Sequence, residues 1–176
     1  MGRNLLTLTG LALCFGTIAQ AEVALNIGYL KVFQPQPPTL SNLDPEPEDI
    51  GLAGALTGLD DNATTGRFLG HTYTLTDAIL EEGDDTLAAA ADLLAQTPFL
   101  IIDAPAKTLL TIADLPQAED ALIFNAASGD VSLRRDACRA NMLHTVPSDA
   151  MRTDALAQMF VKKRWDDLVM IAGTHA

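Results

Sequence analysis

The sequence predicts an α/β protein in which a parallel sheet is covered on both faces by helices. Short apolar runs, such as "PFLII" (98–102) and "ALIFN" (121–125), have the length and composition of strands that are buried on both sides. These runs alternate with segments of helical periodicity, which is the order that βαβ units require. With 176 residues, of which 48% are hydrophobic, the chain can form a core of ordinary size.

The first 21 residues are predicted to be a secretory signal peptide. Arg3 precedes an apolar run over 5–18, and Ala-Gln-Ala at 19–21 provides a cleavage site. An uncleaved anchor is the alternative, but the run is shorter than the roughly 18–20 residues of a membrane span. A lipoprotein attached at Cys14 is a further alternative, although Leu13 stands where a small residue is expected. We therefore expect export to the periplasm, with no membrane span after cleavage.

The amino-terminal half of the mature chain is predicted to contain two strands, one on each side of a helix. The first strand covers 24–30 ("ALNIGYL"), and residues 34–49 follow as a stiff connection that carries five of the nine prolines. The helix begins near Pro47, since apolar residues recur at helical spacing up to Leu59. Its glycines do not fit GxGxxG, so a dinucleotide site is not expected. The segment "GHTYTLTDA" (70–78) is the second strand.

The carboxyl-terminal half is predicted to continue the alternation of helices and strands. Asp84 or Asp85 can cap a helix that runs to about Gln96. Two further helices are predicted, one from Pro105 to Ala113 and one from Ser148, as its cap, to Arg164. The apolar run Leu168–Ala172 is predicted to be an interior parallel strand.

Charge is distributed unevenly along the chain. Residues 22–133 carry 18 acidic and three basic side chains, whereas residues 134–176 carry five acidic and seven basic ones. This difference predicts two surfaces of different charge, as two lobes would have. With a net charge of −12, the chain has no basic face for phosphate groups, so nucleic acid is not an expected partner.

Taken in order, these segments resemble a type I periplasmic binding protein, which is the solute receptor of an ABC importer, including importers for branched-chain amino acids. The resemblance rests on "CRANMLHTVPSDAMRTDALAQMFVKKRWDDLVMIAG" (138–173), where such receptors pass from the first lobe into the second. The stretches "IGYLKV", "PFLIIDAPAKTLLTIADLP" and "LIFNAAS" are similar to a branch associated with pyrroloquinoline-quinone-dependent alcohol dehydrogenase systems.

The resemblance implies a domain organisation and partners. These receptors are about twice as long, so the chain is expected to be truncated, with a signal peptide at 1–21, lobe 1 at 22–143 and the start of lobe 2 at 144–176. It implies a small-molecule ligand and a permease as partners, no catalytic activity, no metal and no cofactor. An exported accessory or enzyme-like protein of a quinoprotein system, and a nonfunctional truncated product, are the alternatives.

Ligands of parallel α/β sheets bind beyond the carboxyl ends of the strands. Three such ends are predicted, and the candidate ligand-binding residues that follow them are Phe33, Gln34, Asp103, Ala104, Asn125, Ala126 and Ser128. Each has a plainer interpretation. Asp103 can be a helix cap, Ser128 a turn residue, Phe33 a packing residue under the proline-rich loop, and Asn125 a brace for its own loop.

Asp103 and Ala104 depart from the receptors for amino acids, which have a small hydroxyl residue at this position. A carboxylate there opposes the carboxylate of an amino-acid ligand, so a neutral or cationic ligand is expected. The three histidines do not have the spacing of metal ligands. The sequence pattern indicates neither a Ser-His-Asp triad nor a Cys-His pair. His144 is expected to pack near the crossing between the lobes.

Overall fold

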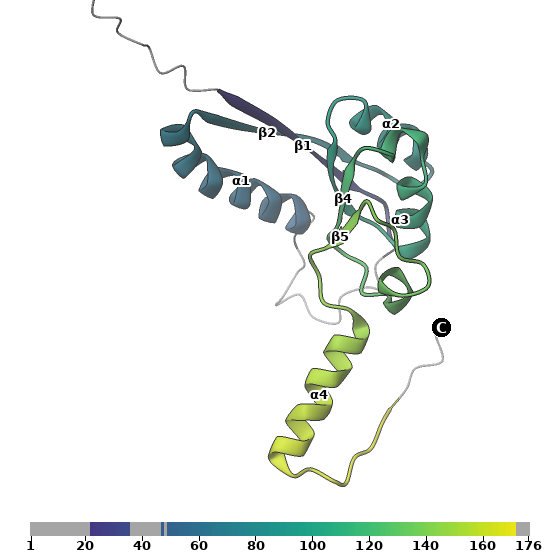
Figure 1. The fold of residues 1–176 in the computed structure, drawn as a ribbon. Coiled ribbons are helices and arrows are strands. Elements are labelled where there is room, and N and C mark those ends of the chain that lie inside the picture. The colour runs from purple at the N-terminus through teal and green to yellow at the C-terminus, as the bar shows by residue number, and fades with distance from the viewer. Residues whose placement is uncertain (1–21, 36–46, 48, 172–176) are drawn as a thin grey trace, which may run out of the picture.

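The computed structural model describes residues 22–35, 47 and 49–171. Its centre is a five-stranded sheet of order β2-β1-β3-β4-β5, in which each neighbouring pair of strands is parallel. The predicted α/β class is therefore confirmed. Figure 1 shows the elements, which are β1 (Val23–Lys31), α1 (Ile50–Leu69), β2 (His71–Ile79), α2 (Thr86–Leu94), β3 (Phe99–Asp103), α3 (Ala106–Ala113), the 3₁₀ turn η1 (Pro116–Ala118), β4 (Leu122–Asn125), the 3₁₀ turn η2 (Val131–Arg134), β5 (Met142–His144) and α4 (Asp149–Lys163).

The main core lies between the sheet and helices α2 and α3. Side chains alternate between the two faces of a strand, so Leu30, Leu100 and Ile102 point to the same face. These side chains are fully buried and form one cluster with Leu93 of α2 and Leu109 of α3. Truncating any one of the fully buried members to alanine is expected to cost about 2–5 kcal/mol, because it leaves a cavity in a close-packed interior.

Helix α1 covers part of the opposite face, over β1 and β2 (Figure 1). It begins just after Pro47, whose carbonyl accepts from the Ile50 amide at 3.3 Å. It continues to Leu69, beyond the last periodic residue that the sequence indicated, and ends at Gly70. The φ of 71° at Gly70 is in the left-handed region that glycine adopts without strain. Most of the predicted proline-rich connection lies outside the described residues.

The helix caps predicted at Asp85 and at Ser148 are both present, at the starts of α2 and α4. The Asp85 carboxylate accepts from the amides of Leu87 and Ala88 at 3.1 and 3.0 Å, and the Ser148 hydroxyl accepts from the Met151 amide at 3.2 Å. Helix α3 differs from these, because its N-cap is Pro105 and no side chain caps it. The interpretation of Asp103 as a helix cap is therefore wrong. Asp103 is instead the last residue of β3.

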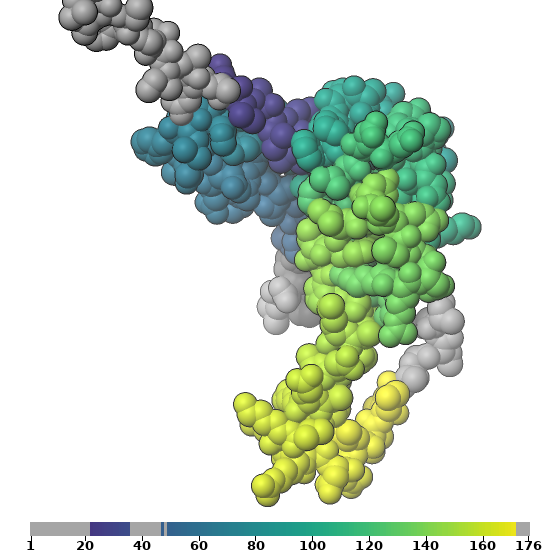
Figure 2. Space-filling view, in the orientation of Figure 1, coloured from purple at the N-terminus to yellow at the C-terminus, as the bar shows by residue number. Residues whose placement is uncertain are grey.

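Helix α4 projects away from the sheet, as Figures 1 and 2 show, and none of its residues is buried. The predicted strand after it does not form in the part of the chain that is described. Residues 165–171 have no regular structure, and Val169, Met170 and Ile171 are 89%, 91% and 95% exposed. A strand exists only through the partners that accept and donate its backbone hydrogen bonds, and no described strand lies beside this one. Ala172, the last residue of the prediction, lies outside the described residues.

The signal-peptide prediction also falls outside the described residues. Within the described ranges, no helix has both the length and the hydropathy to cross a membrane. No cluster of three or more potential metal-binding side chains occurs among those same residues. Cys138 is a free, exposed thiol.

Candidate functional site

The carboxyl ends of β1 and β3 bring two of the predicted site residues into direct contact. Lys31 of β1 pairs in register with Asp103 of β3, and the Val32 amide donates to the Asp103 carbonyl at 2.9 Å. This pairing places Gln34 beside the Asp103 side chain, where its Nε2 donates to Oδ1 at 3.3 Å. Phe33, which precedes Gln34 in the sequence, is 41% exposed. The edge therefore carries a carboxylate, an amide and an accessible aromatic ring.

Tyr29 belongs to the same site, although the sequence patterns did not indicate it. Its side chain is 1% exposed, and its hydroxyl has no hydrogen-bond partner among the described residues. Burial, with the negative charge of Asp103 as the second cause, raises the pKa of Tyr29 to about 12. Tyr29 therefore stays protonated as a hydrogen-bond donor over the whole physiological pH range.

The first turn of α1 closes over this hydroxyl. A Cβ atom on Gly51 would collide with the Tyr29 hydroxyl oxygen, and it would lie 3.5 Å from Oδ2 of Asp103. Gly51 therefore permits the close approach of the helix to both side chains. The amino-terminal end of α1, with its exposed amide dipoles, adjoins a buried hydroxyl and a carboxylate.

The end of β4 holds a second group of predicted residues. Asn125 is fully buried, and its Oδ1 accepts from the amides of Ala127 and Ser128 at 3.2 and 2.9 Å. Its Nδ2 donates to the Ser128 carbonyl at 2.7 Å and lies 3.1 Å from Nδ1 of His144. Of its two interpretations, the structure places Asn125 as the brace of the loop that follows β4. That loop, rather than the Asn125 side chain, faces outward at the sheet edge.

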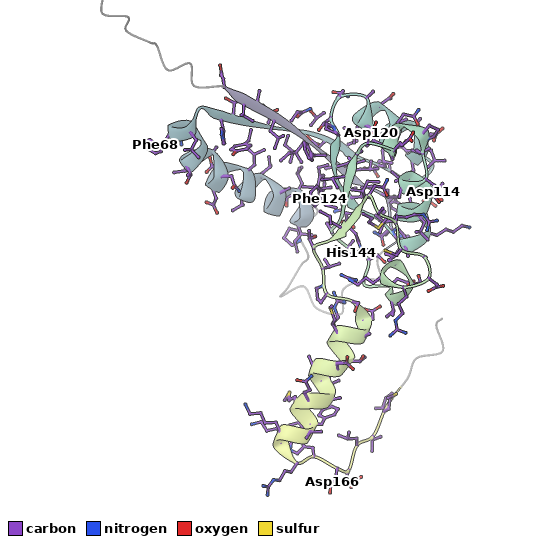
Figure 3. The ribbon with its side chains drawn as sticks, viewed as in Figure 1. Phe68, Asp114, Asp120, Phe124, His144 and Asp166 are labelled. Carbon is purple, nitrogen blue, oxygen red and sulfur yellow. The ribbon has the colours of Figure 1, made fainter. Side chains whose placement is uncertain are left out.

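His144, at the end of β5, completes this group (Figure 3). Because Nδ2 of Asn125 is a donor, we assign Nδ1 of His144 as the acceptor and place its proton on Nε2. Burial, and then the nearby Arg134 charge, hold the pKa of His144 below its ordinary value. Arg134 also donates to the carbonyl of Val146, which fixes the chain as it leaves the sheet toward α4.

Ala104 and Ala126 offer little to a ligand. Ala104 is 1% exposed and belongs to the core cluster. The Ala126 amide already donates to the Ile102 carbonyl at 3.0 Å, so it extends the ladder between β3 and β4. None of the seven predicted site residues lines the groove between α1 and the sheet. The sheet edge carries polar groups, and a ligand bound there would need a second wall to enclose it.

The comparisons with known proteins bear on the fold. A scan against protein-family models found no match. A search of curated proteins likewise found no match. Among solved structures, the chain is similar to an ABC transporter substrate-binding protein from Desulfitobacterium hafniense, with 19% sequence identity and a TM-score of 0.57. The similarity covers 80% of this chain and 39% of that protein, so the chain spans well under half of its length. The chain therefore has the parallel α/β fold that a substrate-binding protein also adopts.

Proposed function

We propose that the chain is the ligand-holding part of a periplasmic substrate-binding protein that serves an ABC-type importer. The observation that carries the proposal is the pair of polar side chains, Gln34 after β1 and Asp103 at the end of β3, that meet at the carboxyl edge of the sheet. In open parallel sheets this edge is where ligands bind. The likeness of the fold to a substrate-binding protein, and the resemblance of residues 138–173 to the lobe crossing of such receptors, support the same role.

The second wall of the site would come from a second lobe. We assign lobe 1 to residues 22–143 and the start of lobe 2 to residues 144–176. Two observations favour this division. The sheet ends with His144, and α4 leaves the body with no buried residue. A segment with so few packing contacts can change its orientation when a ligand draws two lobes together.

The location and the partners follow from the same reasoning. A signal peptide at 1–21 would send the protein to the periplasm, where the closed receptor would meet a permease. The resemblance of the sequence to the branch found with pyrroloquinoline-quinone-dependent alcohol dehydrogenases supports a link of this receptor to such an alcohol oxidation system. The similarity of the fold to a substrate-binding protein supports a binding role rather than an enzymatic one.

The ligand is neutral or cationic. The negative charge of Asp103 already acts on the Tyr29 hydroxyl, and a ligand carboxylate at this edge would meet the same field. At about 4 Å, with an effective dielectric constant near 20, two like charges repel by roughly 4 kcal/mol. That repulsion corresponds to about a thousandfold in affinity, less whatever the Lys31 ammonium, in register with Asp103, offsets. A ligand hydroxyl or amine could instead donate to the carboxylate.

Calorimetry tests the proposal with leucine, isoleucine and valine beside neutral alcohols and primary amines. We expect an alcohol or an amine to bind the wild-type protein and to lose affinity in Asp103→Asn, and leucine to bind weakly or not at all. Asp120→Asn, an exposed carboxylate at the opposite edge of the sheet, is the matched control and should change nothing. Micromolar leucine binding that Asp103→Asn leaves unchanged contradicts the assigned ligand class. Binding of none of these compounds by the intact protein contradicts the receptor function.

A further inference from the structure

A groove of about 400 Å³ lies between α1 and the sheet, next to the contact of Gly51 with Tyr29, and neither of these two residues lines it. Its floor is formed by Leu25 and Ile27 of β1, Leu75 of β2 and Ile101 of β3. Its remaining lining residues are Gly54, Ala55, Gly58, Leu59, Asn62 and Tyr73. The volume falls within the roughly 300–1,000 Å³ that is typical of small-molecule sites, and the lining is almost wholly apolar.

The groove is held open by contacts at its two ends. Gly51 rests on the Tyr29 hydroxyl at one end of α1, and near the other end a Cβ on Gly66 would lie 2.6 Å from Cε2 of Tyr73. These two glycines are 15 residues apart in the numbering, or about 22 Å along a helix. Glycine is already the smallest residue, so the helix cannot move closer at either end.

Between these contacts, two glycines of the helix face open space. A Cβ on Gly54 or Gly58 would meet nothing within 4 Å. The two tyrosine rings act as supports, and the shorter aliphatic side chains between them leave the gap. The groove is therefore a consequence of how α1 is seated, and packing of the helix onto the sheet cannot remove it.

The groups that line the groove indicate which class of ligand it can bind. The long apolar floor suits an aliphatic chain, and polar groups lie in one part of the groove. Nδ2 of Asn62 donates to the Gly58 carbonyl at 2.7 Å, and no described group donates to its Oδ1. The Tyr73 hydroxyl lies 3.1 Å from Nδ1 of His71. A head group that donates a hydrogen bond could reach the Asn62 oxygen.

We propose that this groove binds a linear aliphatic molecule with a hydrogen-bond-donating head group, at a site separate from the carboxyl edge of the sheet. The proposal does not depend on the receptor function. Each methylene that enters the groove is expected to raise the affinity about fourfold. Affinity should therefore rise with chain length and then level off once the groove is full.

The test is displacement of the apolar fluorophore N-phenyl-1-naphthylamine by primary alcohols of 6 to 14 carbons, on the purified intact protein. Gly58→Leu places a side chain in the groove without a clash and is expected to weaken dye and dodecan-1-ol binding more than tenfold. Thr57→Leu, on the exposed side of the same helix turn, is the matched control and should bind as the wild type does. Circular dichroism and thermal unfolding verify that both variants fold.

Several outcomes overturn the proposal. It fails if the wild-type protein takes up no dye, or if Gly58→Leu binds the dye and dodecan-1-ol as tightly as the wild type does. It also fails if dye uptake disappears as the protein forms a dimer, because a second copy would then be the occupant. Asn62→Ala should weaken dodecan-1-ol and leave the dye unaffected. If Asn62→Ala binds dodecan-1-ol as tightly as the wild type does, the assignment of a head group that donates to Asn62 is wrong.

Discussion

The side-chain amide of Asn125 lies 3.1 Å from Nδ1 of His144, which joins the end of β4 to the end of β5. The carbonyl of Asn125 also accepts from the Thr145 amide at 3.1 Å and from the Thr145 hydroxyl at 3.0 Å. Main chain and side chain of one buried asparagine therefore hold both the loop after β4 and the segment that leads to α4. The carboxyl edge of the sheet depends on this residue for its shape.

We first predict that Asn125→Ala lowers the free energy of unfolding by about 2–3 kcal/mol. The substitution leaves the Ala127 and Ser128 amides and the His144 ring without their partner in a partly buried place, and it empties the buried position of the Asn125 side chain. Urea denaturation measures the loss. Gln96→Ala, which removes one exposed hydrogen bond to the Asp92 carbonyl, is the control and should stay within about 0.5 kcal/mol. An equal effect of the two substitutions would contradict the role of Asn125 as a brace.

Protonation of His144 should destabilise the fold. Its pKa in the folded protein is held below the ordinary value of 6.5, so below that pH the unfolded chain binds more protons than the folded one. Its contribution to stability is complete above about pH 6.5 and is lost as the pH falls through the folded pKa. We expect the free energy of unfolding to decrease between pH 7.5 and pH 5, and His144→Gln to reduce this decrease.

His71→Asn provides the matched control for the pH experiment. His71 lies at the start of β2, at the other side of the sheet, where its ring contacts Tyr73. A comparison of the two variants shows whether an effect on the pH dependence is specific to His144. If His144→Gln retains the full decrease, another group is responsible for it.

The exposed apolar segment at 168–171 is expected to cause self-association. Val169, Met170 and Ile171 present contiguous aliphatic surface and unpaired backbone groups, which favour pairing with another chain. Replacing all three by serine should shift sedimentation toward the monomer without lowering thermal stability, because these side chains make no buried contacts. Asp166→Ser with Asp167→Ser changes the same segment without removing apolar surface and should not reduce association. A wild-type protein that stays monomeric at high micromolar concentration contradicts this prediction.

Local signals were sufficient for most of the fold. The caps at Asp85 and Ser148, and the apolar runs of β3 and β4, depend on neighbours within a few residues, so periodicity and capping rules found them. Strand β5 was missed because Met142–His144 is too short to show any period. The strand predicted at Leu168–Ala172 failed for the opposite reason. Its composition suits a strand, but a strand forms only where other strands lie beside it.

The candidate site was harder to predict than the fold. The rule that ligands bind at the carboxyl edge brought Gln34 and Asp103 together correctly, since the register of parallel strands determines which strand ends meet. It could not assign Asn125 to bracing rather than ligand contact, because that depends on the path of a loop. Tyr29 was missed since its role arises from contact with Gly51, 22 positions later in the numbering, and no local pattern encodes that contact. The one available signal was an aromatic residue in a strand that is otherwise mostly aliphatic.

The contact between Gly51 and Tyr29 yields the last prediction. A methyl group on Gly51 would collide with the Tyr29 hydroxyl, so Gly51→Ala should lower the free energy of unfolding by about 1–3 kcal/mol, despite the higher helix propensity of alanine. Gly54→Ala lies three residues along the same helix in open space, and it should stabilise the protein by about 0.5–1 kcal/mol.

Tyr29→Phe provides the decisive second variant. It removes a buried hydroxyl that has no partner among the described residues, so alone it should raise the free energy of unfolding by about 1 kcal/mol. In combination with Gly51→Ala it also removes the atom that causes the collision, so the double variant should recover most of the lost stability. A double-mutant cycle from urea denaturation then gives a coupling free energy well above the error of the measurement. Additive effects of the two substitutions would mean that α1 does not rest on Tyr29, and the support at one end of the groove would be lost with it.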